Sequence, residues 1–227
     1  MFFKELVLYN RPLIIIFHYI NMSFPDGKFN TLAEFKNSYS KILHESLTEI
    51  DDVSMKSCFD MLISGINSGV NLLSCGNGGS SSIAEHLVCD FIKQASSGST
   101  IKPKVIPLLT TPVITAIAND ISYDDIFSFQ VERYANSDDI LISVSSSGDS
   151  QNIINAINTA KNLGVKTISF VGFDGGRANQ ISDVSLHIKA YNYGIVEDAH
   201  HALMHIFSQY LRLENFEDTK NISNTKF

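Results

Sequence analysis

Positive charge is scarce in this 227-residue sequence, which has 17 lysines and arginines against 24 aspartates and glutamates and a formal net charge of −7. Such an acidic chain, with a pI near 5.4, has no general attraction for a nucleic-acid backbone. We therefore expect no nucleic-acid partner. An anionic small molecule would have to be held by local backbone N–H groups and hydroxyls.

Cysteines and long apolar runs are also few. The three cysteines (Cys58, Cys75 and Cys89) are odd in number and form no C-x-x-C pair. This pattern fits a reducing cytoplasm better than a disulfide scaffold. The apolar run at residues 13–17 is much shorter than the roughly 20 residues that a membrane-spanning helix needs. We therefore expect a cytoplasmic protein that has no membrane partner.

The glycine-rich stretches match neither the dinucleotide-binding motif nor the P-loop motif, so a nucleotide is not indicated. Two Ser/Gly turns are present instead, at residues 74–82 and at Ser145-Ser-Ser-Gly-Asp-Ser150. Each follows an apolar run and precedes a helical pattern, an arrangement that directs backbone N–H groups at one point and favours phosphate. Glycines and serines also make ordinary tight turns and N-caps. Two such turns together predict a phosphorylated small-molecule ligand.

The spacing of apolar residues predicts an α/β fold. Two N-terminal helices are expected over residues 32–50 and 53–68, which contain no proline. Short β-branched runs then alternate with helical patterns. Strands are expected at residues 71–75, 104–108, 140–144, 167–171 and 184–188, and helices at 81–94, 112–120, 126–134, 150–163, 177–181 and 196–213. This alternation predicts a three-layer sandwich around a five-stranded parallel sheet. Both Ser/Gly turns fall at the carboxyl edge of the sheet, where ligands bind in such folds.

The ends of the chain differ from this central part. We expect one domain over residues 29–213, preceded by an N-terminal extension over residues 1–28. Within that extension, Met22 is expected to be the natural start, with residues 1–21 lying upstream of the native protein. Residues 214–227 are rich in Asn, Asp, Lys and Thr and are expected to form a flexible tail.

Titratable side chains gather on two of the predicted helices. His86 and Asp90 are four residues apart on the helix after the first Ser/Gly turn. Glu197, His201 and His205 are spaced by four on the last helix, so they share one face. If folding brought these two faces together, they could bind Zn²⁺ or carry out acid–base chemistry.

Simpler interpretations of these residues stay open. A lone helical histidine is usually a surface residue or an interior residue whose hydrogen bonds are satisfied. Asp90 could do no more than form an ion pair with Lys93. Glu197 and Asp198 could only complement the helix dipole. Because His200 and His201 are adjacent, they cannot both face one site, so at least one of them should be structural.

Several separated motifs resemble the sugar isomerase (SIS) domain superfamily, and within it the phosphoheptose (sedoheptulose 7-phosphate) isomerases. The resemblance runs over residues 29–213. Its markers, in order, are Cys75-Gly-Asn-Gly-Gly-Ser80 with His86, Ile114-Thr-Ala-Ile-Ala-Asn-Asp120, the second Ser/Gly turn, Gly172-Phe-Asp-Gly-Gly176 and the histidine-containing last helix.

This resemblance implies a flavodoxin-like five-stranded parallel sheet and a homotetramer with active sites at subunit boundaries. It also implies an enzyme that interconverts sedoheptulose 7-phosphate and D-glycero-D-manno-heptose 7-phosphate, for lipopolysaccharide or capsule biosynthesis. Two alternatives stay open. One is a non-catalytic SIS protein that binds a sugar phosphate or has a regulatory role, and the other is an isomerase of a different sugar phosphate.

Site residues follow from the resemblance by position. The phosphate and sugar would be held by Asn77, Gly78, Gly79, Ser80, Ser145, Ser146, Ser147 and Ser150, and the sugar chain also by Asn119, Asp120 and Glu197. One Zn²⁺ in each active site would be held by His86, Asp90, Glu197 and His205. The catalytic residues would be Asp90, Glu197 and His205.

The chain departs from the family pattern at three of its positions. Asp90 and Glu197 stand where the family usually has Glu and Gln, and Thr110 stands where an acidic residue is common. Aldose–ketose isomerisation needs a base to remove the proton next to the carbonyl and an acid to protonate the carbonyl oxygen. Either Asp90 or Glu197 could be the base, with His205 as the opposing acid. His86 would hold the metal or orient the base.

Overall fold

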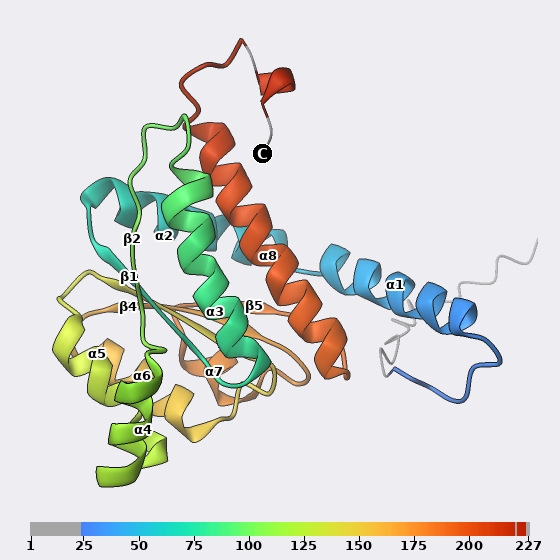
Figure 1. Ribbon diagram of the computed structural model, residues 1–227, viewed down its shortest axis with the longest axis horizontal. Coiled ribbons are helices and arrows are strands. Elements are labelled where there is room, and N and C mark those ends of the chain that lie inside the picture. Colours follow the sequence, from blue (N-terminus) through green and yellow to red (C-terminus); the bar gives the residue numbers. More distant parts are fainter. Residues whose placement is uncertain (1–23, 221, 226–227) are drawn as a thin grey trace, which may run out of the picture.

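The computed structural model describes residues 24–220 and 222–225 (Figure 1). The predicted start at Met22 therefore lies outside the described residues. Five parallel strands form one sheet in the order β2-β1-β3-β4-β5. They are β1 (Asn71–Gly76), β2 (Lys104–Pro107), β3 (Ile140–Ser145), β4 (Lys166–Val171) and β5 (Val184–His187). This is the flavodoxin-like order, in which the chain reverses its direction of travel between β1 and β3. The predicted sheet is confirmed.

Eight α-helices accompany the sheet in the described residues. They are α1 (Leu32–Thr48), α2 (Asp52–Ser68), α3 (Gly79–Cys89), α4 (Thr111–Asp120), α5 (Ser128–Tyr134), α6 (Gln151–Asn162), α7 (Gly176–Ile181) and α8 (Tyr193–Glu214). Three short segments are the π-helix η1 (Asp90–Ala95) and the 3-10 turns η2 (Tyr123–Asp125) and η3 (Ile222–Asn224). The one clear departure is that the helix predicted over residues 81–94 widens into the π-helix at Asp90.

Two hydrophobic cores fill the spaces on either side of the sheet. Helices α2, α3 and α8 cover one face, and α5, α6 and α7 cover the other (Figure 1). Successive strand residues alternate between the cores: Leu72 belongs to the first core and Leu73 to the second. Each fully buried Leu or Ile contributes about 1.5–3 kcal/mol. The burial of both strand faces therefore holds the sheet edge, and the turns that leave it, in fixed positions.

Helix α1 lies outside this sandwich and projects from it (Figure 1). It is attached to the start of α8, where the Tyr39 hydroxyl donates a hydrogen bond of 2.6 Å to Asp198. Phe24 packs between α1 and the sandwich, with its ring centre 4.7 Å from that of Phe35. The attachment places α1 beside Glu197, one of the predicted site residues.

The first residues after α8 are bonded to the loop that follows η1. Ser99 and Phe216 form an antiparallel bridge, and Glu217 N donates to Gly98 O at 3.0 Å. A flexible tail for the remaining residues stays a prediction, as do the domain limits at residues 29 and 213. Of the helices in the described part of the chain, none has both the length and the apolar character that crossing a bilayer requires.

Candidate active site

The first Ser/Gly turn connects β1 to α3 at the switch point of the sheet. Asn77, Gly78, Gly79 and Ser80 line a pocket of about 250 Å³ at this edge. Within the described residues, no side chain caps the start of α3 at Gly78. The first N–H groups of a helix have no partner inside the helix and carry partial positive charge. The turn therefore directs an open helix terminus at the pocket, and the binding of phosphate there stays a prediction.

The second Ser/Gly turn lines the same pocket from the neighbouring strand. Ser145, Ser146, Ser147 and Ser150 all lie on its wall, between the end of β3 and the start of α6. The Ser146 hydroxyl is buried and has no hydrogen-bond partner among the residues that the structure describes. A buried polar group without a partner is costly unless a ligand or water completes it. The two turns thus form one cradle, which we call the anion cradle.

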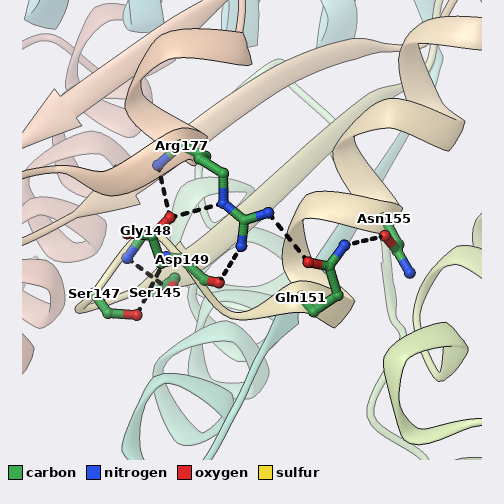
Figure 2. A network of polar contacts seen from close by, with 7 residues as sticks. All are labelled: Ser145, Ser147, Gly148, Asp149, Gln151, Asn155 and Arg177. Atoms are coloured by element: carbon green, nitrogen blue, oxygen red, sulfur yellow. Dashed lines mark hydrogen bonds and ion pairs between the residues drawn. The ribbon is translucent and has the colours of Figure 1, made fainter.

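Arg177 braces the second turn from outside the pocket. Figure 2 shows its guanidinium reaching from α7 to Asp149, where Nε donates to Oδ1 at 2.9 Å and Nη2 donates to the Asp149 carbonyl at 2.7 Å. The same side chain also donates to Gln151 at 3.1 Å. The pairing lowers the pKa of the Asp149 carboxyl. Gly148 packs so closely on the Gly175 carbonyl that no side chain would fit there. The turn is therefore held rigidly, and the negative charge of Asp149 is compensated.

Glu197 reaches the anion cradle from the first turns of α8. It lines the pocket, and its carboxylate lies directly against Gly79, where a Cβ atom would come within 2.3 Å of Oε2. Burial, and to a smaller degree the neighbouring Asp198, raises the pKa of the Glu197 carboxyl above its usual value. The glycine is thus needed for the close approach of this carboxylate, which is also more basic than an ordinary Glu.

Asp90 is the centre of a second group of polar residues, further along α3. Its side chain is buried, and Asp90 Oδ2 lies 2.7 Å from His205 Nδ1 on α8. Ser208 donates to the same oxygen at 3.3 Å, and His86 Nε2 lies 3.3 Å from Oδ1. Asp90 is the residue at which the α-helix changes to the π-helix, and its N–H donates to the carbonyls of both His86 and Leu87. Such π segments often occur at functional sites.

The adjacent histidines on α8 point to opposite sides. His200 is buried, with its ring centre 6.0 Å from that of Phe170, and burial lowers its pKa to about 4. His201 faces the other way, with its ring 5.5 Å from His86 and 6.1 Å from His205. Burial and these two neighbours lower the pKa of His201. The expectation that one of the pair is structural is confirmed, and His200 is that residue.

A metal ion fits the second group. One donor atom from each of His86, Asp90 and His205 lies within 4.8 Å of the other two. Imidazole nitrogen and carboxylate oxygen are the ligands that Zn²⁺ commonly takes. Three of the four predicted ligands are therefore together. Glu197, the fourth, lies outside this donor group, next to Gly79.

Asn119 and Asp120 lie elsewhere. They are exposed at the end of α4, where Asn119 Nδ2 donates to Asp120 Oδ1 at 2.7 Å, and they are not among the residues that line the cradle. Their predicted contact with the sugar stays a prediction.

Sequence reasoning missed some residues of the site. Tyr193 lines the pocket, and Asn152 Nδ2 donates to Asn77 Oδ1 at 3.1 Å. The position of Asn152 just after the second Ser/Gly turn was the available signal. Tyr193 lies before the start of the last helix as the sequence predicts it, at residue 196, so the helical pattern did not include it.

Comparison with known proteins agrees with this arrangement. The SIS domain family matches residues 34–172. The phosphoheptose isomerase of Helicobacter pylori (strain P12) is 32% identical over 169 residues, which cover 74% of this chain and 88% of that protein. The probable phosphoheptose isomerase of Thermoplasma acidophilum is 39% identical over 153 residues, which cover 65% of this chain and 81% of that protein. A solved phosphoheptose isomerase from Francisella tularensis superposes with a TM-score of 0.74 at 26% identity, covering 80% of this chain and 98% of that one.

The family match spans more than half of the chain, and these relatives are covered over most of their length. Together with the flavodoxin-like sheet and the two Ser/Gly turns at its switch point, this shows that the chain belongs to the SIS domain family, in the group of the phosphoheptose isomerases.

Proposed function

We propose that this protein is an aldose–ketose isomerase that converts sedoheptulose 7-phosphate into D-glycero-D-manno-heptose 7-phosphate through an enediol. One observation carries the proposal: the first turns of α3 and α8 line the anion cradle, and the same two helices place the His205–Asp90 pair further along. Helices α3 and α8 both start at the cradle and run side by side to the pair (Figure 1). The names of the relatives agree with this substrate.

The helix geometry suits a ligand that has its phosphate and its reacting carbons at opposite ends. Gly79 and His86 are seven residues apart on α3, which corresponds to about 10 Å along the helix axis. Glu197 and His205 are eight residues apart on α8, or about 12 Å. A sugar phosphate in its open-chain form can place its phosphate in the Ser145–Ser150 turn and extend its carbonyl end past Glu197 toward His205.

Glu197 is the proton acceptor of the proposed reaction. It faces the pocket, and its raised pKa makes it a better base than an ordinary carboxylate. It takes the proton from the carbon next to the carbonyl and returns it to the neighbouring carbon. His205 gives a proton to the carbonyl oxygen and takes one from the adjacent hydroxyl. Asp90 holds the His205 ring through Nδ1 and is itself held by Ser208, so it orients the acid.

Zinc is the metal we propose for His86, Asp90 and His205. When bound, it would supply Lewis-acid polarisation of the substrate oxygens. A His205 nitrogen that holds zinc has no proton to give, so the metal would then take the place of His205 as the acid. The chain's own contribution is the placement of three donors from two helices around one point.

The proposed assembly is a homotetramer in the cytoplasm that serves lipopolysaccharide or capsule biosynthesis, with active sites at subunit boundaries. An apolar groove of about 370 Å³ between α2 and α8 supports self-association, since it is lined by Phe59, Ile206 and Tyr210. Ile206 and Tyr210 are 45% and 47% exposed in the single chain. Apolar side chains gathered on one exposed face are typical of interfaces.

The test is incubation of the purified protein with sedoheptulose 7-phosphate in D₂O, followed by ¹H NMR. The expected result is the anomeric proton signal of the aldose, with deuterium at its C2 in those molecules for which the proton held by Glu197 exchanges with the solvent before it is returned. Binding without turnover would favour a non-catalytic sugar-phosphate-binding protein. Turnover of another phosphorylated ketose, but not of this one, would favour the alternative isomerase.

A further inference from the structure

Each of the two helices at the second polar group presents a pair of donor residues spaced by four. His86 and Asp90 lie on α3 and its π extension, and His201 and His205 lie on the facing side of α8. We propose that His201, and not Glu197, supplies the fourth protein ligand of the zinc ion. The inference rests on the proposed function only in that it takes the metal of that site to be zinc.

The distances between the centres of the imidazole rings support His201 as the fourth ligand. The centres of the His86 and His205 rings lie 5.2 Å apart, His86 and His201 5.5 Å, and His201 and His205 6.1 Å. Two imidazoles that bind one tetrahedral zinc at the usual bond length of about 2.0–2.1 Å have their ring centres roughly 5 Å apart. All three separations are close to this value, so the rings are near enough to share one zinc ion once a His201 nitrogen turns toward the other donors.

The helical register agrees with the ring separations. Two histidines at positions i and i+4 on one helix face form a recurrent zinc-binding pair, and His201 and His205 have this spacing. His201 nitrogen atoms lie outside the compact group formed by His86, Asp90 and His205. Its ring meets His86 edge-on at 79°, and a rotation about the His201 side-chain torsions would aim a nitrogen at the centre.

Glu197 is less suited to the fourth position. It stands one turn before His201, which is about 6 Å further along the helix axis, and its carboxylate is packed against Gly79 in the anion cradle. With His201 as the ligand, the zinc has three neutral imidazoles and the single carboxylate of Asp90. Glu197 then remains free to accept a proton from the substrate.

The test measures zinc affinity rather than turnover. The full-length protein and the variants His201→Ala, His201→Gln and Glu197→Gln are titrated with Zn²⁺ against a chromophoric chelator. The d–d absorption of the Co²⁺-loaded proteins is then recorded. His44, exposed on α1, provides the matched control His44→Ala. No substrate is present, so the result does not depend on whether the protein is an isomerase.

We expect both His201 variants to lose zinc affinity by about 100-fold or more. Replacing even a residue that only hydrogen-bonds to a metal ligand costs about 10–100-fold in metal affinity, and a direct ligand should cost at least as much. The Co²⁺ absorption of both His201 variants should also change in intensity, whereas Glu197→Gln and the control should stay within about twofold of the unchanged protein. His201→Gln keeps most of the side-chain volume and decides the question if His201→Ala does not fold. Unchanged affinity in a folded His201 variant, or a comparable loss in Glu197→Gln, would overturn the proposal.

Discussion

Gly79→Ala tests whether the position of the Glu197 carboxylate matters to catalysis. The added Cβ would stand 2.3 Å from Glu197 Oε2 and 2.5 Å from Oε1. The carboxylate would have to retreat by about 1 Å to reach ordinary contact, and a misplacement of that size at a reacting group can cost about 100-fold in rate. The backbone N–H of residue 79 is kept, so the anion cradle should still bind phosphate.

Stability should change little in this variant. The clash involves the far end of a flexible side chain, and alanine is a better helix former than glycine by about 0.5–1 kcal/mol in a helix interior. We therefore expect kcat to fall by 10- to 100-fold, with KM and the melting temperature almost unchanged, as measured by steady-state kinetics and calorimetry. Gly27→Ala is the control, because that position has open space around it. A Gly79→Ala enzyme with full kcat would refute the role given to Glu197.

Three further changes probe other parts of the site and fold. His205→Ala should lower kcat by about 10²–10⁴-fold while the sugar phosphate still binds by calorimetry; retained turnover would remove His205 from the mechanism. Arg177→Ala should raise KM about fivefold at unchanged kcat, since an exposed ion pair is worth at most about 1 kcal/mol, and Arg177→Lys should recover part of the loss. The pKa of His200 in the folded chain is about 4. As pH falls from 6.5 to 4, the unfolded chain therefore takes up a proton on this residue while the folded chain does not. This difference lowers the free energy of unfolding by roughly 3 kcal/mol. Urea unfolding of His200→Leu should lack this acid-side loss, and an unchanged pH dependence would contradict the assignment.

The sheet could be predicted because each strand is marked in its own local sequence by a short apolar run between turn residues. The run Asn71–Gly76 is bounded by a turn on either side, and its residues are buried on both faces, so burial selects apolar and small side chains in succession. The start of the π-helix at Asp90 could not be predicted. The segment η1 packs against α8, which lies far away in the sequence, and a change from α to π leaves the period of apolar residues almost intact over a single turn.

The shared face of Glu197, His201 and His205 illustrates a limit of helical spacing. Residues at i, i+4 and i+8 point the same way, but each lies about 6 Å further along the helix axis than the one before it. A common direction therefore does not give a common centre. Which of the three meet His86 and Asp90 depends on how far α8 is shifted along α3, a property of the packed pair of helices that neither segment contains alone.

The same shift explains why this edge of the sheet suits a two-ended ligand. Helix α3 begins at the switch point between β1 and β3, and α8, which follows β5, brings Tyr193 and Glu197 of its first turns to the same pocket. The first residues of both helices therefore meet the anion, and each later turn of α3 and α8 faces a point further from it. Glu197 lies at the first level, against Gly79, and His205 with Asp90 lies beyond it. The order of groups along two parallel helices thereby sets the order in which a bound sugar phosphate meets its anchor, its base and its acid.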